Sequence, residues 1–186
     1  MDFLTLAKAR YSVRKLSDHP IEKEKIEKIL KAAQLAPTAM NFQPHRILVI
    51  DAPQELEKMR NSTRYHYNAP LVMVVCYDTN VSWKRDFDEK DEGIVDASVV
   101  ATHMLLEVAN LGLGSTWVGH FDPELISKNF NLPDTILPVA LLPIGYPAPE
   151  AKPAHLHDSR IELNEFVFYN QFPANYNSEK TDSTKK

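Results

Sequence analysis

The hydrophobic positions along the chain follow a helical repeat in some stretches and a strand pattern in others. Apolar residues recur at helical spacing over 2–10 and over 21–33, where a charged face lies opposite. The second helix is expected to end near Ala36, because the following proline disfavours helical geometry in the residue before it. A strand is predicted at 45–50, and the continuous apolar run at 71–77 predicts a second strand that is central in its sheet.

The second half of the chain contains the longest helical pattern, from Asp91 to Leu111. Apolar residues cover nearly its whole circumference, which predicts a buried helix, and in a short chain a dimer interface is a natural place for it. Gly112 and Gly114 are expected to end this helix. The remaining predicted elements are a helix at 53–60, an extended piece at 117–119, a helix at 122–129, and strands at 137–146 and 162–169.

Length and composition favour one globular domain. The chain has 186 residues, of which 44% are hydrophobic and 25% charged, enough for a substantial core. Neither an internal repeat nor a linker interrupts it. We therefore expect a single domain over residues 1–173, followed by a polar tail, 174–186, that is expected to be disordered.

Charge and cysteine content exclude several classes of protein. A net charge of −4 argues against a nucleic-acid partner. No apolar run approaches the roughly 20 residues needed to cross a bilayer, and the first residues lack the apolar core of a signal peptide. The single cysteine, Cys76, lies in an apolar run, so we interpret it as a buried core thiol in a reducing compartment. The predicted location is the cytoplasm, with no membrane partner.

A basic segment follows the first predicted helix. Arg10 and Arg14 flank Ser12 in a stretch expected to be extended, which places Ser12 and Arg14 on one side. Arginine suits a phosphate because its planar fork donates two parallel hydrogen bonds. Two solvated surface charges are the alternative interpretation of such a pair.

An amide-rich loop follows the second predicted helix. Thr38, Asn41 and Gln43 precede Pro44, and amides that both donate and accept match the edge of a pyrimidine ring. Turn formation before the proline explains them about as well. Together, the basic segment and the loop suit a ligand with an anionic end and a flat hydrogen-bonding ring, such as flavin mononucleotide (FMN).

Other chemistries lack their motifs. The glycines within 112–119 close a helix, whereas a dinucleotide-binding loop follows a strand and opens a helix. His155 and His157 have no HExxH or paired CxxC partner, so no metal site is expected. Neither a phosphate-binding P-loop nor a GxSxG nucleophile motif occurs.

The order and spacing of these segments resemble the nitroreductase family of FMN-dependent oxidoreductases. The resemblance extends from about residue 3 to residue 170, and each motif alone is only modestly specific. The matching segments are 10–14, 36–44, the helix from Asp96, 112–119, 142–147 and 159–160.

The resemblance implies an α+β fold, with a central, mostly antiparallel sheet between helices, and an intertwined homodimer that holds FMN at the subunit interface. It implies that Arg10 and Arg160 contact the phosphate near Ser12, and that Arg14 approaches the N1/O2 side of the ring. Some lining residues would come from the partner subunit. The other residues expected in the cofactor site are Tyr11, Pro37, Thr38, Asn41, Gln43, Thr116, Trp117, Val118, Gly119 and Ser159.

Two positions depart from the family pattern. Ser159 stands where a basic residue is frequent, which places more of the phosphate binding on Arg10, Arg160 or His157. Residues 38–40 are Thr-Ala-Met where a Ser-Gly-like sequence is frequent, so the cavity over the ring is expected to differ.

The implied activity is a ping-pong reaction. NADH or NADPH delivers hydride to flavin N5, the nicotinamide leaves, and a small-molecule electron acceptor takes its place. Nitroaromatics and quinones are the acceptors that the family indicates. Because the cofactor carries the chemistry, no catalytic side chain is assigned. The alternatives are a reductase of an activated alkene or fatty-acid-derived metabolite, a flavin-binding regulatory protein without turnover, and a ligand-free structural dimer.

Overall fold

The computed structural model describes residues 2–174 and 176. The chain forms two compact units, Met1–Ala154 and His155–Lys186, and each is described by itself. A single domain over 1–173 stays a prediction. The predicted disordered tail, 174–186, lies almost entirely outside the described residues.

A four-stranded sheet forms the centre of the first unit. Strands β1 (His45–Ile50), β2 (Leu71–Asp78), β3 (Gly114–Ser115) and β4 (Ile136–Gly145) are arranged in the order β1-β2-β4-β3. All three neighbouring pairs are antiparallel. The prediction of an α+β fold with an antiparallel sheet is therefore confirmed, and so is the central place of β2.

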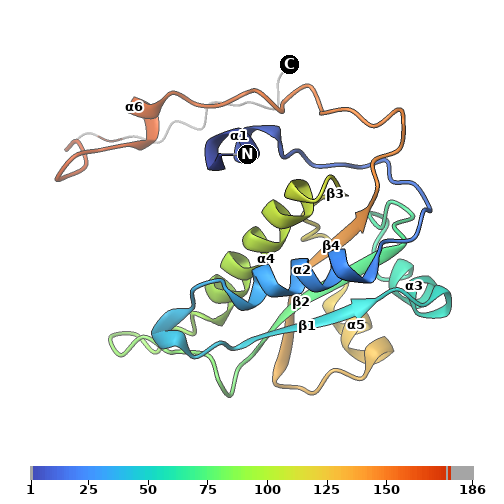
Figure 1. The fold of residues 1–186 in the computed structure, drawn as a ribbon. Coiled ribbons are helices and arrows are strands. Elements are labelled where there is room, and N and C mark those ends of the chain that lie inside the picture. The colour runs from blue at the N-terminus through green and yellow to red at the C-terminus, as the bar shows by residue number, and fades with distance from the viewer. Residues whose placement is uncertain (1, 175, 177–186) are drawn as a thin grey trace. The chain divides into compact units, whose positions relative to one another are not determined.

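Strand β2 is buried on both faces, which explains its unbroken apolar sequence. Successive side chains of a strand point to opposite faces, so its residues divide between two hydrophobic clusters. Helices α2 (Lys23–Gln34) and α4 (Gly93–Asn110) pack on one face, and α3 (Pro53–Arg60) and α5 (Pro123–Phe130) cover the other, as Figure 1 shows. On β2, the first cluster contains Leu71, Met73 and Val75, and the second contains Val72, Val74 and Cys76.

The predicted helices agree with the structure to within a few residues. Helix α1 (Phe3–Ala9) packs against α4, and α2 ends at Gln34, shortly before Pro37. Gly112 has a φ of +73°, a left-handed conformation that suits the residue after a helix. Gly114 has a different role, because it opens β3 instead of closing the helix.

One predicted strand is wrong. Residues 162–169 were expected to be extended, but Leu163–Phe166 form a short helix, α6. A capping box explains the difference: the side chains of Glu162 and Glu165 each accept a hydrogen bond from the other residue's backbone N–H. A strand needs a neighbour to pair with, whereas this turn satisfies its backbone groups locally.

None of the described helices is both long and apolar enough to cross a membrane.

Gly114 provides a test of how the basic segment is attached to the sheet. A Cβ atom at this position would lie 2.8 Å from three atoms of the Val13 side chain. We expect Gly114→Ala to destabilise the protein by about 1–3 kcal/mol, the usual range for overpacking, measured by urea unfolding. At Gly119, the nearest atom is 3.7 Å away, so Gly119→Ala is the matched control. Equal stability of the two variants would contradict a tight contact at Gly114.

Candidate functional site

The basic segment is extended and is held against β3. Helix α1 ends at Ala9, and the Arg10 N–H donates to the Leu6 carbonyl. Val13 is buried, and its N–H donates to the Ser115 carbonyl at 3.0 Å, beside a parallel bridge between Ser12 and Ser115. The predicted alternation is therefore present: Val13 points into the core, and the exposed Arg14 stands at the next position along the segment.

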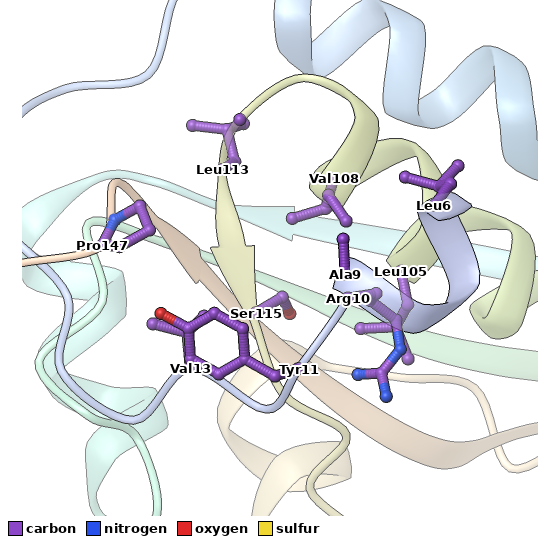
Figure 2. A pocket seen from close by; sticks show the side chains of 12 residues that line it. Leu6, Ala9, Arg10, Tyr11, Val13, Leu105, Val108, Leu113, Ser115 and Pro147 are labelled. Atoms are coloured by element: carbon purple, nitrogen blue, oxygen red, sulfur yellow. The ribbon is translucent and has the colours of Figure 1, made fainter. Parts of the chain in front are cut away.

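A cavity of about 200 Å³ lies beside this segment. Its walls come from α1, from the carboxyl-terminal end of α4, and from Arg10, Tyr11 and Ser115 (Figure 2). The Ser115 side chain is 4% exposed, and its hydroxyl has no hydrogen-bond partner among the described residues. A buried hydroxyl without a partner is costly. Because Ser115 is one of the residues that line this cavity, a ligand or water bound there is the available partner for its hydroxyl.

The amide-rich loop has an unusual backbone. Met40, Asn41 and Gln43 all have positive φ angles, between 51° and 56°. Such left-handed conformations of residues other than glycine cost on the order of 1–3 kcal/mol each, and they cluster at functional sites. The strain must be offset by contacts that hold the loop.

Two side chains hold this loop by accepting hydrogen bonds from its backbone. The Thr38 hydroxyl accepts from the Gln43 N–H at 3.1 Å, and Asp96 Oδ1, from α4, accepts from the Ala39 N–H at 2.9 Å. The Gln43 side chain also donates to the Asn41 carbonyl, at 3.3 Å. Pro37, Asn41 and Gln43 are exposed. The polar groups predicted to meet a ring are thus accessible on a fixed backbone.

The third predicted segment, Thr116–Gly119, runs on from β3. Thr116 is buried, and Val118 bridges to Leu141 of β4 and packs in the cluster beneath α3 and α5. Trp117 and Gly119 are exposed. The predicted extended piece is therefore present as a single bridge, and its odd-numbered positions are the accessible ones.

The structure places the basic segment and the amide-rich loop at opposite ends of helix α4. The cavity beside Arg10 contacts α4 at Leu105 and Val108, near its carboxyl end, whereas the loop is attached to Asp96, near its amino end. At 1.5 Å per residue, Asp96 and Val108 are about 18 Å apart along the helix axis. In Figure 1, the loop and α1 lie at opposite ends of α4. A single copy of the chain therefore does not bring the basic segment and the amide loop together.

Ser159 and Arg160 belong to the second unit. The Arg160 guanidinium donates to the backbone carbonyls of His157 and Ser159. Their predicted place at the phosphate stays a prediction, because the two units are described separately.

Metal and thiol chemistry find no support in the described residues. No group of histidine, cysteine and acidic side chains there is arranged to hold a metal ion. Burial raises the pKa of the Cys76 thiol to about 12, so it remains protonated and unreactive at neutral pH. This agrees with Cys76 as a core residue.

Sequence reasoning missed two residues of this region. Asp96 stands out as a carboxylate among the mainly apolar residues of the first half of that helix, and this was the available signal. Ser115 had no comparable signal, because a serine after a glycine is ordinary. Only the tertiary structure shows that its hydroxyl is buried beside a cavity.

Comparison with known proteins identifies the family. Residues 7–67 and 64–146 match the model of the nitroreductase family. A nitroreductase family protein of Clostridium difficile 630 has a crystal structure that superposes with a TM-score of 0.86, at 41% identity over 92% of this chain and 100% of that one. An FMN-dependent nitroreductase from another Clostridium difficile strain superposes with a TM-score of 0.76, at 30% identity over 91% of this chain and 100% of that one.

A Methanothermobacter thermautotrophicus protein, provisionally named NADH dehydrogenase/NAD(P)H nitroreductase, is 32% identical over 89% of this chain and 88% of its own length. The chain belongs to the nitroreductase family.

The groups described above fit FMN. The phosphate needs cationic and hydroxyl donors, and the half-buried Arg10 lines the same cavity as Ser115, whose hydroxyl has no partner among the described residues. The flavin ring needs donors and acceptors along one edge, and the loop offers Asn41 and Gln43 on an exposed, fixed backbone. The groups that suit the phosphate lie at the carboxyl end of α4, and the groups that suit the ring lie at its amino end.

Proposed function

We propose that this protein is an FMN-dependent oxidoreductase that uses NADH or NADPH to reduce nitroaromatic or quinone-type acceptors in a ping-pong cycle, with hydride passing through flavin N5. The observation that carries the proposal is the basic segment held against β3, where Arg10 lines the same cavity as Ser115, whose hydroxyl has no partner in the described part of the chain. Family membership supports the cofactor and the donor. When bound, FMN supplies the electron transfer, and the protein supplies binding, orientation and charge.

In this proposal the chain's own residues have separate roles. Arg10, Tyr11 and Ser12 hold the phosphate end, joined by Ser159 and Arg160 of the second unit. Arg14 lies near the N1/O2 edge, where a positive charge stabilises the reduced ring. The other proposed contacts to the ring come from Pro37, Thr38, Asn41, Gln43 and Thr116–Gly119.

The proposed assembly is a homodimer with two composite sites. Its support is the separation along α4: the chain holds its amide loop at Asp96, about 18 Å along the helix axis from Val108 at its own cavity, so a second copy can supply the loop. Apolar side chains exposed near the loop fit such an interface. They are Met40, Phe42, Ile94 and Val95, with exposed fractions from 46% to 73%. The unpaired cysteine favours the cytoplasm as the place of action.

A visible spectrum of the purified protein tests cofactor and donor together. We expect flavin absorption bands that bleach on anaerobic addition of NADH or NADPH and return when a quinone is added. In solution, the mass should be twice the 21.2 kDa of one chain. Bound FMN that neither donor bleaches would make the protein a flavin-binding protein without turnover. Colourless protein after FMN supplementation would refute the proposal.

Arg14 is expected to tune the flavin. Arg14→Ala should lower the reduction potential and slow reduction by NAD(P)H about tenfold, equivalent to about 1.4 kcal/mol, because a positive charge near N1/O2 is lost. Some FMN should remain bound. Lys15→Ala removes the same charge from the next exposed residue and is the control. Unchanged potential and reduction rate in Arg14→Ala would overturn this role.

Ser115 is expected to bind the cofactor's phosphate end. Ser115→Ala should weaken FMN binding about 5- to 20-fold, since a net hydrogen bond contributes roughly 1–2 kcal/mol. The apoprotein should be no less stable, because an unsatisfied buried hydroxyl is removed. Ser62→Ala is the matched control: its buried hydroxyl already donates to the Met59 carbonyl at 2.6 Å. That variant should lose stability and keep its FMN affinity. An unchanged FMN dissociation constant for Ser115→Ala would mean that the Ser115 hydroxyl bonds to water and does not bind FMN.

A further inference from the structure

Asp96 is a buried carboxylate in a largely apolar helix. Its side chain is 4% exposed, and its immediate helical neighbours Val95 and Ala97 are apolar. A charged group in such a place is expensive unless it is paired or accepts hydrogen bonds. Its hydrogen bond to the strained loop supplies one such contact.

The carboxylate connects α4 to the loop at the loop's first turn. Asp96 Oδ1 accepts from the Ala39 N–H at 2.9 Å, and Ala39 is the first residue of the 3₁₀ turn η1 (Ala39–Asn41). The next two residues, Met40 and Asn41, already have positive φ. The anchored N–H therefore lies directly before the strained stretch.

The second carboxylate oxygen does not bond to the loop. Asp96 Oδ2 is buried and has no hydrogen-bond partner among the described residues. Burial and the nearby Arg46 lower the pKa of His45, and Asp96 opposes this shift. Asp96 is thus close to the end of the loop, where β1 begins, as well as to its start.

We propose that Asp96 is a positioning residue of the cofactor site: by accepting the Ala39 N–H, it holds the loop from Thr38 to Gln43 in the shape that meets the flavin ring. This inference rests on the proposed function, because it takes the loop as a flavin contact. Thr38 closes the other side of the loop through the Gln43 N–H. Asp96 acts through the backbone and does not touch the ring.

Two variants separate the acceptor from the charge. Asp96→Ala removes both, whereas Asp96→Asn keeps an oxygen that can accept from Ala39. For Asp96→Ala, we expect amide exchange in the peptide containing Ala39 to be at least tenfold faster in the apoprotein. Its FMN dissociation constant should rise about tenfold, and the potential of the bound flavin should shift. For Asp96→Asn, the amide-exchange rate of that peptide and the FMN dissociation constant should both stay within about threefold of those of the unmodified protein.

Ala39→Pro removes the donor from the other side of the same contact. Proline is tolerated at the first position of a helical turn, and Thr38 already has the extended backbone, φ −136° and ψ 159°, that a residue before proline adopts. We expect Ala39→Pro to weaken FMN binding like Asp96→Ala, and the double variant to be no worse than either one alone. It also keeps the test decisive if Asp96→Ala does not fold.

Ser98→Ala is the matched control on α4. The Ser98 hydroxyl donates to the Ile94 carbonyl within the helix, at 2.7 Å, and does not hold the loop. In Ser98→Ala, the FMN affinity and the amide exchange of the peptide containing Ala39 should be unchanged. Equal effects of Asp96→Asn and Asp96→Ala would overturn the proposal, and so would faster exchange without a change in FMN affinity or potential. Absence of FMN from the unmodified protein would refute the proposed function instead, while the exchange experiment would still report on the contact between Asp96 and Ala39.

Discussion

The packing of α4 against the sheet is the constraint on which the candidate site depends. Val100, Ala101 and Met104 are fully buried against the face of the sheet that also carries Leu71 and Met73. This packing fixes the position of both ends of the helix. One end contacts the cavity beside Arg10, and the other contacts the amide-rich loop through Asp96. A shift of α4 would therefore move both groups of candidate cofactor contacts at once.

The two ends stabilise their neighbouring segments in different ways. At the carboxyl end, strand-like contacts hold the basic segment, with the Val13 N–H donating to the Ser115 carbonyl and Gly114 leaving room for the Val13 side chain. At the amino end, side-chain acceptors hold a backbone that is locally unfavourable. The basic segment is held in place because it continues the sheet. The amide-rich loop is held in place because two side-chain acceptors offset its backbone strain. Both arrangements present polar groups on a fixed frame, which is what a binding site requires.

Sequence reasoning was most successful where the hydrophobic pattern was long or a punctuating residue was strong. The unbroken apolar run of β2 predicted a central strand. The prediction was right because a strand buried on both faces needs apolar residues at successive positions. Pro37 and Gly112 marked helix ends because their backbone preferences are local properties. The wrong strand at 162–169 has a local cause too: alternation over a few residues competed with the capping box between Glu162 and Glu165, and the capping box prevailed.

The sequence by itself determined most of the elements, the family and the residue types of the candidate site, because hydrophobic periodicity and motif order depend only on neighbours along the chain. The tertiary structure alone decided that the Ser115 hydroxyl is buried with no partner among the described residues, and that Asp96 reaches across 57 positions to the Ala39 N–H. It also decided that the basic segment and the amide loop lie at opposite ends of α4. Such facts depend on how distant segments pack, and no local pattern records the packing of residues that are far apart in the chain.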